Sequence, residues 1–238
     1  IVHLARISKR AVRKDFAGAV RAVFEDLIEA GLGSMPGGGA EVFDDRVHDE
    51  AFRGKIRSDE WLTVHRTAHE LGLMTNATML YGHVESLEDR VHHLCMLRDE
   101  QDHALQNNFR GHFQTIIPLP FFPDGSELEH LPGPSGIENL RTLAVARLML
   151  DNFPHVKAFW IMQTLPMSQL MLEAGADDID GTVVWYDITK VGGSSTHQEV
   201  TTHDLQRAIK EAGFDPVERD TLYRRVLREG KSWSVVES

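Results

Sequence analysis

The sequence is short of residues and patterns that several classes of protein need. Its 238 residues include one cysteine, Cys95, which excludes an internal disulfide framework and leads us to expect a reducing, cytoplasmic compartment. No apolar run approaches the roughly 20 residues that a membrane-spanning helix requires. The first residues lack the charged-then-apolar layout of a signal peptide. We therefore expect no membrane partner.

Positive charge is also scarce. The chain has 25 Lys and Arg against 36 Asp and Glu, a net charge of −11 with His neutral. This balance argues against a nucleic-acid or anionic-membrane partner. The one basic group, Arg219, Arg224, Arg225 and Arg228, is predicted to form a solvated face of a C-terminal helix. The chain opens with Ile1 in the middle of a pattern, which suggests a piece of a longer protein.

The motifs of several enzyme classes are missing as well. The sequence has no G-x-S-x-G elbow, no Walker loop and no paired-carboxylate glycosidase signature, so nucleophilic hydrolysis has no support. Cys95 stands in a helical pattern, and we expect it to be a small buried residue. His65 and His69 have a zinc-binding spacing, but Arg66 stands where the zincin motif has Glu. We predict a packing or surface role for them and no metal ligand in the chain.

What the chain does have is a regular alternation of two patterns. Amphipathic helix patterns, several with an N-capping Ser or Thr, alternate with short apolar runs. The apolar runs cover residues 31–35, 74–81, 113–119, 156–162 and 179–185. This alternation is typical of βα units on a parallel sheet, and a closed barrel needs eight of them.

We therefore predict an α/β fold that forms the C-terminal portion of a (β/α)8 TIM-type barrel, or a smaller open sheet. The predicted partial barrel covers residues 1–185, and a C-terminal helical extension covers residues 186–238.

Polar residues gather where the apolar run 74–81 ends. In a strand, Asn76 and Thr78 would share one face and Tyr81 would lie on the other. Inward-pointing Asn76 and Thr78 need hydrogen-bond partners, which either a ligand or a neighbouring strand could supply. His83 follows at the exit, where it could serve as acid, base or ligand. We predict Tyr81 and His83 to be catalytic residues.

Gly37, Gly38 and Gly39 form a triplet in the loop after a predicted strand. Three glycines permit close backbone approach to a ligand, and their N–H groups can cradle a polar group. A flexible connector is the alternative interpretation. Glu41 follows the triplet and is placed to accept hydrogen bonds from a ribose or an ammonium group.

These two stretches also carry a family resemblance. Residues 36–41 and 75–83 resemble the radical S-adenosylmethionine (SAM) enzymes of futalosine-pathway menaquinone synthesis, most closely the aminofutalosine synthase family. Further matching pieces follow in family order at residues 64–69, 113–120, 147–154, 175–178, 180–182 and 218–223. Cyclic dehypoxanthine futalosine synthase and the deazaflavin-forming FO synthase subunit share the barrel and several of these pieces.

The resemblance implies a radical SAM barrel with a 4Fe–4S cluster and an external electron donor such as flavodoxin or ferredoxin. In that family the reduced cluster cleaves SAM, and the 5′-deoxyadenosyl radical adds to the enolpyruvyl double bond of 3-[(1-carboxyvinyl)oxy]benzoate. Loss of the carboxylate then gives aminofutalosine. The resemblance places SAM against Gly37, Gly38, Gly39 and Glu41, with Asn76 and Thr78 lining the shared pocket.

The chain departs from the family in one respect. Such enzymes hold their cluster on a CxxxCxxC loop, and one cysteine cannot replace its thiolates. The cluster ligands are therefore expected outside these residues, and the chain alone is expected to be inactive. Two other hypotheses remain open, namely a related radical SAM enzyme with another substrate, and a non-catalytic partial barrel that acts as a binding protein.

Overall fold

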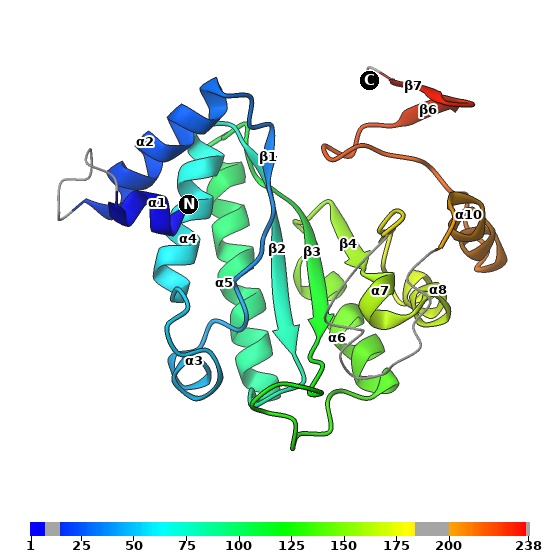
Figure 1. Ribbon diagram of the computed structural model, residues 1–238, viewed down its shortest axis with the longest axis horizontal. Coiled ribbons are helices and arrows are strands. Elements are labelled where there is room, and N and C mark those ends of the chain that lie inside the picture. Colours follow the sequence, from blue (N-terminus) through cyan, green and yellow to red (C-terminus); the bar gives the residue numbers. More distant parts are fainter. Residues whose placement is uncertain (8–14, 184–199, 237–238) are drawn as a thin grey trace.

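The described part of the chain is built on a five-stranded parallel sheet whose strands follow one another in chain order (Figure 1). The computed structural model describes residues 1–7, 15–183 and 200–236. The strands are β1 (Ser34–Met35), β2 (Met74–Tyr81), β3 (Phe113–Pro120), β4 (His155–Ala158) and β5 (Asp178–Ile179). At least one helix connects each strand to the next, which confirms the predicted alternation of βα units.

The helices begin where the sequence supplies caps. The Ser86 hydroxyl accepts a hydrogen bond from the Asp89 N–H, and the Asp89 carboxylate accepts one from the Ser86 N–H. Ser135 and Thr201 cap their helices through the same kind of side-chain contact. The helices are α1 (Val2–Ile7), α2 (Phe16–Glu29), α3 (Asp45–Ala51), α4 (Ser58–Glu70), α5 (Leu87–Gln106), α6 (Gly136–Met149), α7 (Trp160–Gln163), α8 (Leu165–Glu173) and α10 (Thr202–Glu211).

The main core lies between one face of the sheet and the helices. Ala77 and Met79 of β2 are fully buried there, against Leu94 and Leu97 of α5 and Leu143 of α6. The opposite face of the sheet carries the alternate side chains of each strand. It is this second, concave face that a barrel would enclose.

Three predicted strands are shorter in the structure. The run 156–162 ends as a strand at Ala158, and α7 begins at Trp160, so this apolar run is divided between a strand and a helical turn. Only Ser34–Met35 of the run 31–35 pairs with β2. Of the run 179–185, only Ile179 belongs to β5, and residues 180–183 are not in a strand. Residues 184 and 185 and the predicted boundary after them lie outside the described residues.

The C-terminal arginines do not form a helix face, and that interpretation was wrong. After α10 the chain is extended and ends in an antiparallel hairpin of β6 (Val226–Glu229) and β7 (Ser232–Val235). Arg219 instead reaches Asp178 of β5, and Arg228 pairs with Glu218. Pro216 lacks the N–H that helical hydrogen bonding requires and favours an extended residue before it.

The expectation for Cys95 was also wrong, because its side chain is exposed. Leu94 and Leu97 of α5 are buried, and they lie on one face because residues three apart are neighbours on a helix. Cys95 directly follows Leu94 and therefore points away from that face.

Buried neutral histidines connect the helices to β2. His65 Nδ1 and His69 Nε2 lie 2.9 and 2.8 Å from the Thr75 hydroxyl oxygen, which confirms the predicted packing role of this pair. His93 accepts a hydrogen bond from the Phe43 N–H and lies 3.1 Å from the Thr78 carbonyl oxygen. Burial lowers the pKa of His69 and that of His93 to about 3.

We therefore expect the protein to lose stability in mild acid. A histidine in an unfolded chain has a pKa near 6.5. Below that pH the unfolded chain binds protons that the buried rings of His69 and His93 do not bind, and this stabilises the unfolded state. Between pH 7 and pH 5 this costs about 2 kcal/mol of unfolding free energy for each such ring, or roughly 4 kcal/mol for the two. Urea unfolding at both pH values measures the loss. Equal stability at both pH values would contradict the argument.

Candidate active site

The parallel register arranges the inward-facing side chains in layers across the concave face. Asn76 pairs with Thr115, and Thr115 pairs with His155. Two residues further along each strand, Thr78 pairs with Ile117, and Lys157 of β4 pairs with Asp178 of β5. The last layer, nearest the C-terminal ends of the strands, contains Leu80 and Leu119.

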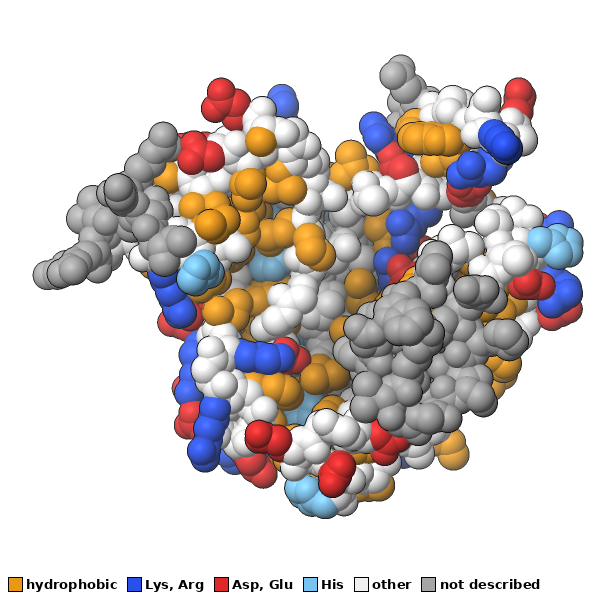
Figure 2. Space-filling view, in the orientation of Figure 1, with side chains coloured by type: hydrophobic (Ala, Val, Ile, Leu, Met, Phe, Trp, Pro, Cys, Tyr) orange, Lys and Arg blue, Asp and Glu red, His pale blue; other side chains and the backbone are white. Residues whose placement is uncertain are grey.

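This face is only partly covered. Asn76, Leu80, Ile117 and Leu119 are half-buried in the two longest strands of the sheet, whereas Met79 on the helix side is fully buried. Figure 2 shows a hollow in the middle of the molecule, between the part that contains α2 and the part that contains α10. The inner face therefore has room for a ligand.

The glycine loop runs beside β2. The Leu80 N–H donates to the Glu41 carbonyl oxygen at 3.0 Å, and the Thr78 hydroxyl donates to the Gly37 carbonyl oxygen at 2.7 Å. Gly37 is buried so closely that a Cβ on it would lie 2.2 Å from the Asn76 carbonyl oxygen. The structure thus brings Gly37, Glu41, Asn76 and Thr78 together, as the sequence predicted. The close approach at Gly37 is to the protein's own strand.

Gly38 and Gly39 differ from Gly37 in their surroundings. Both are exposed, and nothing lies within 4 Å of a Cβ built on either residue. Gly39 has a φ of 86°, a conformation that favours glycine. Gly38 and Gly39 therefore keep the open backbone that the predicted ligand cradle requires.

At the C-terminal end of β2, Glu41, His48, Phe52, Lys55 and His83 form a group that we call the mouth cluster. The Lys55 ammonium donates to the Glu41 carboxylate at 2.5 Å and lies 5.2 Å from the centre of the Phe52 ring. The His83 ring meets Phe52 edge-on at 5.0 Å. His48 is 2% exposed, and neither of its ring nitrogens has a hydrogen-bond partner among the described residues.

His83 belongs to this cluster, but its ring is fully enclosed. Its Nε2 lies 2.9 Å from the Leu80 carbonyl oxygen, and its Nδ1 lies 3.0 Å from a Glu85 carboxylate oxygen. Burial lowers the pKa of His83, while the nearby Glu85 acts in the opposite direction. The ring is thus held by its own exit loop, and its catalytic role stays a prediction.

Tyr81 lies on the other side of β2. Its hydroxyl donates to the Asn139 side-chain oxygen at 2.9 Å and accepts from the Gln163 amide at 3.0 Å, both on the helix side of the sheet. Burial raises the pKa of Tyr81, so the phenol stays protonated. The structure therefore does not bring Tyr81 together with Asn76 and Thr78, and its contacts are those of a packed core residue. Its catalytic role remains a prediction that this placement does not favour.

A second polar group occupies the inner face further along the sheet, and sequence reasoning did not single it out as a site. We call it the inner-face cluster, and its members are His155, Lys157, Asp178, Asp180, Arg219 and Tyr223. Two patterns could have indicated it. Lys157 interrupts an apolar run, and Asp178 and Asp180 stand two apart around Ile179, which places both on one face of a strand.

Asp178 holds the C-terminal segment against this face. Arg219 donates to both of its carboxylate oxygens, from Nε at 3.0 Å and from a terminal nitrogen at 2.7 Å. The Tyr223 hydroxyl donates to the same carboxylate at 2.7 Å, and the Tyr223 ring stacks on His155 with centroids 3.9 Å apart. Because His155 begins β4, the segment covers the N-terminal end of the sheet, opposite the mouth cluster.

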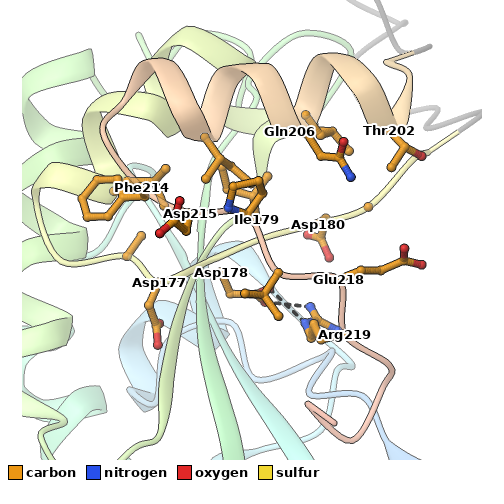
Figure 3. A pocket seen from close by; sticks show the side chains of 17 residues that line it. Asp177, Asp178, Ile179, Asp180, Thr202, Gln206, Phe214, Asp215, Glu218 and Arg219 are labelled. Atoms are coloured by element: carbon orange, nitrogen blue, oxygen red, sulfur yellow. Dashed lines mark hydrogen bonds and ion pairs between the residues drawn. The ribbon is translucent and has the colours of Figure 1, made fainter. Parts of the chain in front are cut away.

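A pocket of about 470 Å³ lies beside β5 (Figure 3). One wall is formed by apolar residues of α8 and α10, among them Leu172, Leu205 and Ile209. Another is formed by the segment from Phe214 to Arg219, and Figure 3 shows Arg219 pointing toward Asp178. The pocket therefore shares Asp178, Asp180 and Arg219 with the inner-face cluster.

Within residues 1–7, 15–183 and 200–236 no group of three or more His, Cys, Asp or Glu side chains could hold a metal ion. The one cysteine is exposed on α5, away from both clusters. The same residues include no helix that is long and apolar enough to cross a membrane.

Known proteins match this chain over most of its length. It is 48% identical over 222 residues to aminodeoxyfutalosine synthase of Thermus thermophilus, covering 92% of this chain and 57% of that protein. It is 43% identical over 218 residues to the synthase of the same name from Streptomyces coelicolor, covering 87% of this chain and 54% of that protein. The chain thus spans little more than half the length of these relatives.

A more distant match is 5-amino-6-(D-ribitylamino)uracil–L-tyrosine 4-hydroxyphenyl transferase of Archaeoglobus fulgidus, at 35% identity over 94% of this chain and 62% of that protein. The solved structure of methylornithine synthase has a TM-score of 0.60 at 18% identity, over 87% of this chain and 64% of that chain. This likeness concerns the fold and confirms the barrel-type α/β architecture.

A family model described as the CofH/MqnC C-terminal region matches residues 110–229. The match begins just before β3 and ends with β6, so it includes all six residues of the inner-face cluster. On this match over half of its length, the chain belongs to the CofH/MqnC C-terminal region family.

Proposed function

We propose that the chain is the C-terminal part of a radical SAM transferase of menaquinone biosynthesis. The reaction would add the 5′-deoxyadenosyl group of SAM to 3-[(1-carboxyvinyl)oxy]benzoate and form aminofutalosine. The observation that carries the proposal is the 48% identity to aminodeoxyfutalosine synthase over 92% of the chain. A cytoplasmic location and a flavodoxin or ferredoxin electron donor are part of the same proposal.

The residues around the glycine loop fit SAM. Gly38 and Gly39 offer open backbone, and Lys55 contacts only one of the two Glu41 carboxylate oxygens, which leaves the other for a ribose or an ammonium group. The hydroxyl hydrogen of Thr78 is donated to Gly37, so Thr78 would position the loop more than the ligand. When bound, SAM supplies the 5′-deoxyadenosyl group. The chain's own residues would orient SAM, while Leu80 and Leu119 would exclude water from the inner face.

The residues present do not fit a 4Fe–4S cluster. Cluster ligation needs several cysteine thiolates, and Cys95 is single and exposed on the outside of α5. The proposal therefore assigns the cluster to residues outside this chain, and we derive no step that passes through it.

The second candidate is the reaction of the archaeal relatives. The identity to the Archaeoglobus fulgidus transferase, 35% over 225 residues, favours a shared scaffold with a different acceptor. Under this alternative the inner face would bind 5-amino-6-(D-ribitylamino)uracil and tyrosine instead of 3-[(1-carboxyvinyl)oxy]benzoate.

Substitutions at Gly37 and Gly38 can distinguish a role of the glycine loop in SAM binding from a role in stability. Gly38→Ala should leave the urea unfolding midpoint unchanged, because the added methyl meets nothing, yet it should weaken SAM binding about tenfold by obstructing the cradle. Gly37→Ala should cost about 3 kcal/mol of stability, since its methyl would collide with the Asn76 carbonyl oxygen. Calorimetric titration with SAM and urea unfolding measure the two effects. If Gly38→Ala bound SAM as tightly as the wild type does, the proposed contact between the glycine loop and SAM would be wrong.

The reaction itself is tested with two proteins. The purified 238-residue chain with SAM and dithionite should yield no 5′-deoxyadenosine, because its one cysteine cannot supply the several thiolates that a cluster needs. A chimera that places the N-terminal part of the Thermus thermophilus relative before Ile1 should form aminofutalosine from SAM and 3-[(1-carboxyvinyl)oxy]benzoate, as detected by mass spectrometry. Turnover of 5-amino-6-(D-ribitylamino)uracil with tyrosine, and none of the benzoate, would favour the second candidate. Release of 5′-deoxyadenosine by the chain alone would contradict the assignment of the cluster.

A further inference from the structure

Lys157 is a buried cation on the inner face, which is only partly covered. Its side chain is 8% exposed and projects from β4 toward the concave side, in register with Asp178. Continuing the pairing of Ile116 with Val156 by one residue places Ile117 beside Lys157. A lysine is almost never buried without a counter-charge, so the groups that neutralise it decide what else it can bind.

Asp178 is not free to neutralise Lys157. Its two oxygens already accept three hydrogen bonds, two from Arg219 and one from Tyr223, and the Lys157 ammonium lies 3.5 Å away. The charge of Asp178 is therefore matched by the guanidinium of Arg219. This leaves Asp180 as the counter-ion of Lys157, with its Oδ1 at 2.9 Å from the ammonium.

The Asp180 carboxylate is poorly satisfied in that role. Its Oδ2 is buried and has no hydrogen-bond partner among the described residues. Three charged groups face it, Lys157 from β4, Asp178 from its own strand and Arg219 from the C-terminal segment. Burial raises the pKa of Asp180, and the negative charge of Asp178 acts in the same direction. A proton on Asp180 Oδ2 would therefore break no existing hydrogen bond, because this oxygen has no partner among the described residues.

From this geometry we propose that Lys157 binds a carboxylate group of the substrate, and that Asp180 takes up a proton from solvent as the incoming carboxylate replaces it at the Lys157 ammonium. The proposal rests on the proposed function and deepens it, because 3-[(1-carboxyvinyl)oxy]benzoate carries carboxylates. The half-buried side chains of Ile117 and Leu119 would lie against an aromatic ring.

The exchange keeps the charge of the cluster balanced. Before binding, Lys157 and Arg219 carry two positive charges against the two negative charges of Asp178 and Asp180. Afterwards the ligand carboxylate stands in for Asp180, which is neutral and can donate its new hydrogen. Binding is then linked to the uptake of one proton for each ligand. The affinity should fall about tenfold for each unit of pH between the pKa of Asp180 in the free protein and its higher pKa in the complex.

The test is calorimetric titration of the 238-residue chain with benzoate and with 3-[(1-carboxyvinyl)oxy]benzoate, in two buffers of different ionisation enthalpy at pH 7 and pH 8. Wild type should take up close to one proton for each ligand bound. Lys157→Met should lose at least tenfold in affinity. Asp180→Asn should bind at least threefold more tightly than wild type at pH 8, without proton uptake, because the competing counter-ion is gone. The exposed Lys210→Met of α10 removes the same charge elsewhere and should bind as wild type does.

The outcomes separate this inference from the proposed function. If wild type and Lys157→Met bind the carboxylates equally, or if Asp180→Asn weakens binding as much as Lys157→Met does, the role of Lys157 and Asp180 is overturned and the proposed function stands. If wild type binds SAM but neither carboxylate, the inference is overturned as well. If wild type binds neither SAM nor the carboxylates, both proposals fail. Circular dichroism of each variant shows that the fold is retained, and the tighter binding of Asp180→Asn cannot result from misfolding.

Discussion

The structure depends on the way in which β2 is held at both of its edges and on its helix side. Its backbone is paired with β3 from Thr75 to Tyr81, and the chain from Gly37 to Glu41 lies against its other edge. Thr75 holds two imidazoles of α4, and the Thr78 carbonyl oxygen lies beside the His93 ring of α5. Parallel strands are stabilised by burial, and here hydrogen bonds from α4, α5 and the glycine loop add to the apolar packing on the helix side. Because β2 cannot shift, the residues at its end are held in fixed positions.

Much of this arrangement could be predicted from local patterns. Helix starts at Ser86, Ser135 and Thr201 follow from capping chemistry that needs only a few adjacent residues, and the bounds of β2 follow from an apolar run with clear ends. Gly37 and Glu41 were placed beside Asn76 by the resemblance, and the structure brings them together. Local patterns were sufficient wherever the determining contacts lie within a few residues.

Contacts between distant residues account for what the sequence did not predict. Arg219 was assigned to a helix because its partner, Asp178, lies 41 residues away, and nothing in the residues around Arg219 indicates this pairing. Tyr81 was assigned to chemistry because its type and position suit a barrel mouth, yet its partners Asn139 and Gln163 come from two other βα units. Lys157 was read as part of an apolar run, because its counter-ion, Asp180, lies 23 residues away and comes from the next strand region. In each case tertiary pairing, which short sequence windows do not record, decides the role of the side chain.

The stacking of Trp61 on His65, with ring centroids 3.6 Å apart, gives the protein an optical reporter of its own interior. The Trp61 indole is 2% exposed, and its neighbours are the rings of Phe43, His65 and Phe113. An indole in such surroundings emits at shorter wavelength than one in water, and a charged imidazole in contact with it quenches the emission. The contribution of Trp61, one of four tryptophans in the chain, would therefore change when solvent first reaches the layer between α4 and the sheet.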